Sequence, residues 1–96
     1  ISLMDAERAV PGWELGIEMA PDVRRQGYAR EALAAVIQAF FEKTDTVLFT
    51  GGHYAYNTIS GKLLKELGFT YEGIEHKAMH HAERGPTDLV CYDLEK

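Results

Sequence analysis

The chain has 96 residues, of which 46% are hydrophobic and 26% charged, and its formal net charge is −5. This length and composition predict one globular domain over residues 1–96. The acidic balance disfavours nucleic acid as a partner, because neutralising phosphates needs a basic surface, and no apolar run reaches the length of about 18 residues that indicates a membrane helix. The single cysteine, Cys91, cannot form an internal disulfide, which fits a cytoplasmic protein.

The first half of the chain predicts two strands and a helix. A short apolar stretch at 1–4 is followed by a turn at Pro11-Gly12. The segment 13–19, WELGIEM, alternates apolar and polar residues as a half-buried strand does. From Tyr28 to Lys43 the apolar residues recur with the spacing of an amphipathic helix, at Leu33, Val36, Ile37, Phe40 and Phe41.

The second half predicts a strand, a helix and a hairpin. The run TVLFT at 46–50, bounded by Gly51-Gly52, reads as an interior strand that pairs in parallel with 13–19. A helix should begin near Asn57-Thr58, with Ile59, Leu63 and Leu67 inward, and end at Gly68. Segments 69–79 and 88–94 read as two strands of a hairpin. The expected fold is therefore an α/β domain with a mixed sheet and the element order β-β-α-β-α-β-β.

The stretch APDVRRQGYAREAL at 20–33 places three arginines around Gly27, immediately before the predicted helix. A helix N-terminus presents unpaired backbone N–H groups, and a tight turn at a glycine lets an anion such as a pyrophosphate approach them. Arg24, Arg25 and Arg30 would add positive potential there. A solvated loop whose arginines pair with surface carboxylates is an equally open reading. The spacing is neither that of a P-loop nor that of a dinucleotide-binding turn, which disfavours a nucleotide-binding domain.

Arg24-Arg25-Gln26-Gly27-Tyr28-Ala29 resembles the acyl-CoA-binding motif [Q/R]-x-x-G-x-[G/A] of the GNAT N-acetyltransferase superfamily. NTISGKLLKELGFTYEG at 57–73 is similar to a segment of the RimJ/RimL-like branch, which acetylates ribosomal-protein N-termini, and TDLVCYDLEK resembles that branch's last strand. The resemblance covers residues 13 to 96. It implies a GNAT-like fold that binds acetyl-CoA and acetylates a primary amine, either a protein N-terminus or a small amine.

The resemblance also implies where the cofactor binds. Backbone groups of Ile17, Glu18 and Met19 would bond the pantetheine arm as if it were an added strand. Asn57 would hydrogen-bond the pantetheine side of the cofactor, whereas Lys62 and Lys65 are expected to be solvated rather than to reach phosphates. The pyrophosphate would lie on backbone amides of the turn formed by Arg24, Arg25, Gln26, Gly27, Tyr28, Ala29 and Arg30.

Acetyl transfer needs a neutral amine, a group that polarises the thioester carbonyl and a proton for the leaving thiol. The resemblance implies that the carbonyl donor is the backbone N–H of Met19 or its neighbour. It also implies that Glu14 is the candidate base, since carboxylates near this position serve as base in some relatives; the alternative is an exposed strand residue. The family often has a tyrosine seven residues after its asparagine, but this chain has Leu64 there. The resemblance to the RimJ/RimL-like branch, which commonly lacks that tyrosine, implies that Ser60 stands where the serine of the branch faces the sulfur. The alternative is an ordinary helix residue whose hydroxyl bonds back to a carbonyl.

His76 is the candidate proton relay, because its strand should line the site. No metal is expected. His76 and His80 share a strand face, but residues i and i+4 of a strand are about 13 Å apart, too far to bind one ion.

The family usually has a strand, two helices and a further strand before the segment that resembles ISLM, and the sequence lacks them. Missing strands expose sheet edges and apolar surface, so a homodimer is expected. The open alternatives are a non-catalytic CoA-binding or subunit-interaction module and a fragment of a longer acetyltransferase.

Overall fold

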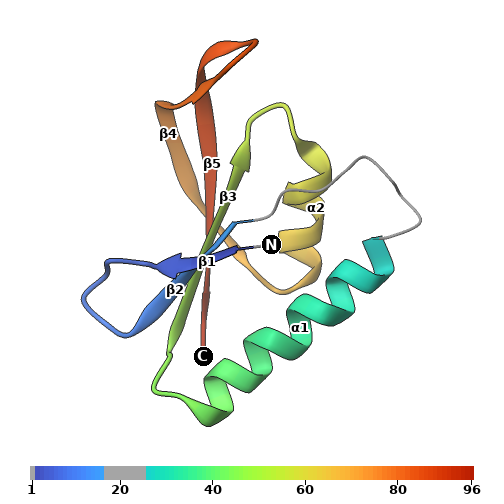
Figure 1. Ribbon diagram of the computed structural model, residues 1–96, viewed down its shortest axis with the longest axis vertical. Coiled ribbons are helices and arrows are strands. Elements are labelled where there is room, and N and C mark those ends of the chain that lie inside the picture. The colour runs from blue at the N-terminus through green and yellow to red at the C-terminus, as the bar shows by residue number, and fades with distance from the viewer. Residues whose placement is uncertain (1, 17–25) are drawn as a thin grey trace.

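The computed structural model describes residues 2–16 and 26–96, which form five strands and two helices (Figure 1). Their order in the chain is the predicted β-β-α-β-α-β-β, which confirms the expected mixed α/β fold. In sequence order they are β1 (Ser2–Asp5), β2 (Gly12–Gly16), α1 (Gln26–Lys43), β3 (Leu48–Tyr54), α2 (Thr58–Glu66), β4 (Thr70–His81) and β5 (Gly85–Glu95).

The strands form one sheet in the order β1-β2-β3-β5-β4. The predicted parallel pairing of β2 with β3 is confirmed, with a register that runs from Gly12 opposite Leu48 to Gly16 opposite Gly52. All other pairings in this sheet are antiparallel, and β4 and β5 form the expected hairpin. The sheet is therefore mixed, with β1 and β4 at its edges.

Strand β3 is longer than the sequence predicted. The glycines expected to end it, Gly51 and Gly52, lie inside it, and the strand continues to Tyr54. The physical reason is packing: a Cβ atom on Gly51 would lie 2.9 Å from a methyl group of Leu64. The missing side chain lets α2 approach the sheet, so this glycine allows close contact and does not mark a turn.

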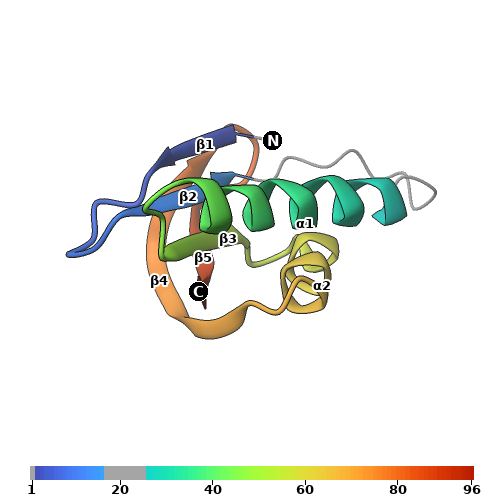
Figure 2. The same cartoon turned by 90° about the horizontal axis from the view of Figure 1, so that it is seen from below.

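Both helices pack on the same face of the sheet (Figures 1 and 2). Phe49 of β3 contacts Phe40 and Phe41 of α1, and two residues later Gly51 contacts α2. Every second residue of a strand points to the same face of the sheet. The residues that alternate with Phe49 and Gly51 therefore face away from the helices. We call that second side, which none of the described helices covers, the open face. The buried core between the helices and the sheet consists of Leu15, Leu33, Ile37, Phe49, Leu63, Leu64, Phe69 and Tyr92.

The amphipathic pattern of α1 is confirmed, since Leu33 and Ile37 are buried. Helix α2 has Asn57 as its N-cap, and Gly68 follows the C-cap with φ +94°, as expected for a glycine that ends a helix. Neither helix is long and apolar enough to span a membrane.

The β4–β5 hairpin extends beyond both predicted strands and projects from the sheet (Figure 1). Residues 82–84 form its turn. Gly85 follows with φ +71°, a backbone conformation that a glycine adopts without strain.

Candidate functional site

The N-terminal turn of α1 contains residues of the predicted pyrophosphate site. The sequence placed Gly27 in a turn before a helix that starts at Tyr28, but the helix already includes Gln26, Gly27 and Ala29. The prediction was two residues late because glycine is a poor helix former, and its propensity gave no reason to extend the helix. The first turn carries no acidic residue. The predicted contributors Ile17, Glu18, Met19, Arg24 and Arg25 lie outside the described residues.

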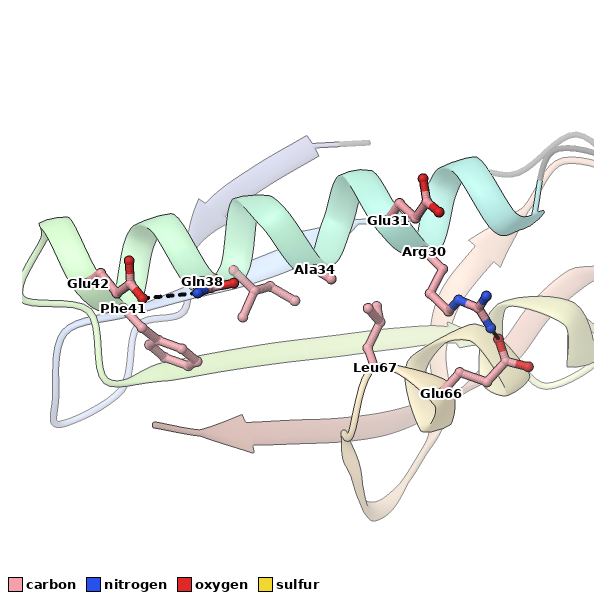
Figure 3. A pocket seen from close by; sticks show the side chains of 9 residues that line it. Arg30, Glu31, Ala34, Gln38, Phe41, Glu42, Glu66 and Leu67 are labelled. Atoms are coloured by element: carbon pink, nitrogen blue, oxygen red, sulfur yellow. Dashed lines mark hydrogen bonds and ion pairs between the residues drawn. The ribbon is translucent and has the colours of Figure 1, made fainter.

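Arg30 points from α1 toward α2 (Figure 3). Its Nη1 lies 3.4 Å from Oε2 of Glu66. The pair belongs to a groove of about 490 Å³ between the two helices, with an apolar floor that includes Ile37, Phe41 and Leu67. Three carboxylates against one guanidinium make this groove unsuitable for a polyphosphate. The acidic members are Glu31, Glu42 and Glu66.

At the N-terminus of α2, Asn57 and Ser60 are in contact. The Oδ1 atom of Asn57 accepts a hydrogen bond of 3.4 Å from the backbone N–H of Ser60. Ser60 is completely buried, and its hydroxyl has no hydrogen-bond partner among the described residues. The sequence left open that this hydroxyl bonds back to a helix carbonyl, but no such bond is present. A buried hydroxyl without a partner costs about 1–3 kcal/mol, so its position demands an explanation.

On the other side of α2, a cavity of about 230 Å³ is flanked by Lys62 and Lys65. Its wall includes His53, which is buried. The Nδ1 atom of His53 is 2.6 Å from the carbonyl oxygen of Tyr54, so Nδ1 carries the proton. Nε2 lies 3.3 Å from the hydroxyl oxygen of Tyr92. Lys62 and Lys65 line this cavity, whereas Arg30 lines the groove between α1 and α2.

Glu14 lies on the open face of the sheet, because its neighbours Trp13 and Leu15 face the core. There it lines a second cavity of about 230 Å³, together with Thr50 of β3 and Cys91 of β5. Glu14 and Ser60 thus lie on opposite sides of the sheet. The structure brings Asn57 and Ser60 together but places Glu14 apart from both.

His76 lies on β4 with 79% of its side chain exposed. Its Nδ1 is 3.4 Å from Oδ2 of Asp88, and the other carboxylate oxygen of Asp88 accepts a 2.9 Å hydrogen bond from the backbone N–H of Lys77. That bond and the nearby His76 lower the pKa of Asp88 below its ordinary value. Lys77 has φ +54° within a bulge of the hairpin, so Asp88 stabilises an unusual backbone conformation.

No group of three or more His, Cys, Asp or Glu within residues 2–16 and 26–96 is arranged to hold a metal ion.

Several open-face residues were not identified as candidates from the sequence. Arg8, in the loop after β1, reaches across the sheet to Glu72 of β4 with an Nη2–Oε1 distance of 2.9 Å. Thr50 and Glu75 line the same cavity as Glu14. The alternation of side chains along each strand was the available signal. It does not reveal which strands are neighbours, and the register alone brings these residues together.

The sequence matches the family model described as acetyltransferase (GNAT) domain over residues 1–70. No curated protein matches the chain. Among solved structures, an acetyltransferase of the GNAT family from Bacillus anthracis is 24% identical, with a TM-score of 0.76 over 88% of this chain and 50% of its own. The ribosomal-protein-S5-alanine acetyltransferase from Vibrio fischeri is 20% identical, with a TM-score of 0.77 over 88% of this chain and 45% of its own.

A third similar structure is RimL, a ribosomal L7/L12 alpha-N-protein acetyltransferase in complex with coenzyme A. It is 19% identical, with a TM-score of 0.77 over 88% of this chain and 47% of its own. The chain therefore spans about half the length of these solved structures. At these identities the likeness establishes a shared fold.

Proposed function

The chain belongs to the acetyltransferase (GNAT) domain family, and from that membership we propose that it binds acetyl-CoA and transfers the acetyl group to a primary amine. The amine would be a protein N-terminus or a small molecule. The observation that carries the proposal is the family match over residues 1–70, because this range includes the N-termini of both helices. Coenzyme A in the similar RimL structure adds support for the choice of co-substrate.

The described residues fit such a ligand at two places. The first turn of α1 offers unpaired backbone N–H groups and no carboxylate that would repel a pyrophosphate. At the N-terminus of α2 the buried Ser60 hydroxyl has unused capacity for a hydrogen bond. Arg24 and Arg25, together with the backbone of Ile17 to Met19, complete the proposed site. Asn57 would orient the start of α2 as well as contact the pantetheine.

Bound acetyl-CoA supplies the acetyl group as a thioester: the amine nitrogen bonds to the carbonyl carbon, the C–S bond breaks, and CoA leaves as a thiol. Glu14 would take the proton that the amine loses, directly or through water. Ser60 would donate a hydrogen bond toward the sulfur. Their positions on opposite sides of the sheet suit these two roles if the thioester lies beyond Gly16 and Gly52, where the described pairing of β2 with β3 ends. His76 would act as a relay only through water, since its side chain is exposed.

The second candidate function is a non-catalytic CoA-binding or subunit-interaction module. The observation that favours it is the coverage, because the chain spans about half of the similar enzymes. Both functions are compatible with the cytoplasmic homodimer that we propose. Edge strand β4 bonds only β5 among the described strands and carries the exposed Tyr71, Ile74 and Met79, which provide surface for association.

The test is calorimetric titration of the purified chain with acetyl-CoA, with its mass measured by light scattering, followed by an assay of thiol release with amine acceptors. Micromolar binding to a dimer with amine-dependent release supports the acetyltransferase. Binding without release from any amine supports the non-catalytic module. Absence of acetyl-CoA binding would overturn both.

A further inference from the structure

The cavity on the open face is built from five separate parts of the chain. Its volume is about 230 Å³, and its walls come from the loop after β1 and from β2, β3, β4 and β5. Among residues 2–16 and 26–96, four carboxylates and one cation line it, and that cation, Arg8, is already paired with Glu72. The cavity therefore has an excess of negative charge. The four are Asp5, Glu7, Glu14 and Glu75.

Thr50 provides an independent indication of a ligand. It is 7% exposed and lies in β3 opposite Glu14. It lines the cavity, and none of the side-chain hydrogen bonds among the described residues involves its hydroxyl. Unlike the hydroxyl of Ser60, this one is not sealed inside the protein, so it can accept a hydrogen bond from a ligand in the cavity. Beside so many carboxylates, the complementary donor is a cationic N–H group.

The raised pKa of Cys91 is consistent with a negative electrostatic potential in the cavity. Its thiol lines the wall, and its pKa is raised first by burial and then by Glu75, Glu72 and Glu14. The carboxylates of two different strands thus act on one point between them. A metal ion is not the favoured occupant, since the described residues contain no suitable ligand group.

The positions of Glu14 and Glu75 also constrain the shape of the ligand. Strands β3 and β5 separate β2 from β4, which is about 14 Å across the sheet at about 4.8 Å per strand. Glu75 pairs with Leu89, four residues along β5 from the level of Glu14, which adds about 13 Å along the strands, so the two backbones lie roughly 19 Å apart. Both residues line the cavity, one from each side of the pair β3 and β5. One ammonium group cannot contact both carboxylates, whereas a short aliphatic chain with an ammonium group at each end can.

We propose that the open-face cavity binds an aliphatic diamine, with one ammonium group at Glu14 and Thr50 and the other at Glu75. The idea that this diamine is the acetyl acceptor rests on the function proposed above. The binding itself does not, because the cavity is formed without the cofactor.

The test is titration of the full chain with diaminobutane. Two comparison compounds are titrated in the same way: butylamine, which carries one ammonium group, and butanediol, which carries no charge. Binding is monitored through the NMR chemical shifts of the backbone amides. Diaminobutane should bind at least several-fold tighter than butylamine, butanediol should not bind, and the shifts should centre on Thr50 and Cys91. Equal binding of the diol and the diamine, or shifts centred elsewhere, would overturn the proposal.

Two substitutions test the assignment of the cavity. Glu75→Gln and Thr50→Val should each weaken diaminobutane binding by about three- to tenfold. Glu83→Gln makes the same charge change in the exposed turn of the hairpin and should leave the affinity unchanged. If Glu83→Gln weakened diaminobutane binding equally, the binding would depend only on the net charge of the protein, and the proposal would be overturned. Thermal melts of each variant establish that the chain is folded.

Titration of the same samples with acetyl-CoA separates this inference from the proposed function. Acetyl-CoA binding without diaminobutane binding overturns the cavity assignment and leaves the acetyltransferase intact. Diaminobutane binding without acetyl-CoA binding supports the cavity and removes the acetyltransferase.

Discussion

His53 and Gly61 lie so close that a Cβ atom on Gly61 would be 2.7 Å from Nε2 of His53. The imidazole cannot move away easily, because Nδ1 is bonded to a backbone carbonyl and the ring stacks on Tyr92 at a centroid distance of 5.6 Å. Helix α2 therefore rests on β3 at a point where no side chain fits.

This contact predicts that Gly61→Ala destabilises the fold. Alanine gains about 1 kcal/mol of helix propensity over glycine, but overpacking a core costs about 1–3 kcal/mol, so we expect a net loss of about 1 kcal/mol. Urea unfolding measures it. In a His53→Ala background the shortest contact is removed and the Tyr92 hydroxyl, 3.2 Å from such a Cβ atom, is the tight neighbour that stays. Gly61→Ala should then cost less than in the wild type, or stabilise the chain by up to about 1 kcal/mol. The same cost in both backgrounds would exclude His53 as the cause.

Gly27→Asp should weaken acetyl-CoA binding severely without lowering the melting temperature. Gly27 lies in the first turn of α1, where a carboxylate interacts favourably with the helix dipole, but the same carboxylate would repel a pyrophosphate. Calorimetry and thermal melts measure the two effects. Ala35→Asp, at an exposed position of the same helix, adds the same charge away from the N-terminus and should leave the affinity intact. Unchanged affinity in Gly27→Asp would contradict the site.

Ser60→Ala should lower the rate of acetyl transfer without lowering the stability of the fold. Removing a buried hydroxyl that has no partner should leave the free energy of unfolding unchanged or raise it by about 1 kcal/mol. If the hydroxyl acts on the thioester sulfur, the rate of thiol release should fall while the affinity for acetyl-CoA changes little. A stable variant with a normal rate would reduce Ser60 to a packing residue.

The sequence predicted the order of elements because each depends on local information: the alternation in β2, the helical spacing in α1, and the asparagine and glycine at the ends of α2. It failed at Gly51 and Gly52, where the glycines serve contact with a helix distant in the sequence. The sequence could not predict the open-face cavity either, because its lining residues come from segments that are distant in the sequence. Glu14, Thr50 and Glu75 line one cavity because of the strand order β2-β3-β5-β4, which alternation within one strand does not encode.

The contact of Asp88 with Lys77 predicts a pH-dependent contribution to stability. The pKa of Asp88 is lowered mainly by the Lys77 backbone N–H and further by His76. A carboxyl whose pKa is lower in the folded state stabilises that state above its unfolded pKa of about 3.9, and this contribution is lost as the pH falls through the folded value. Asp88→Asn should therefore lower the melting temperature at pH 7, and the difference from wild type should vanish in strong acid. A difference that does not depend on pH would contradict a role for the charge.

Cys91 should react slowly with iodoacetamide, with a pH profile displaced upward from that of a small thiol. Burial and the carboxylates of Glu75, Glu72 and Glu14 raise its pKa, so less reactive thiolate is present at a given pH. Glu75→Gln removes one of these charges and should move the midpoint of the profile toward lower pH. Glu83→Gln, in the hairpin turn, should leave it in place, because an exposed charge farther away is screened by solvent and salt. The midpoint is independent of steric access, which scales the rate at every pH by the same factor. A midpoint at or below that of a small thiol would show that the open face lacks the negative potential on which cation binding depends.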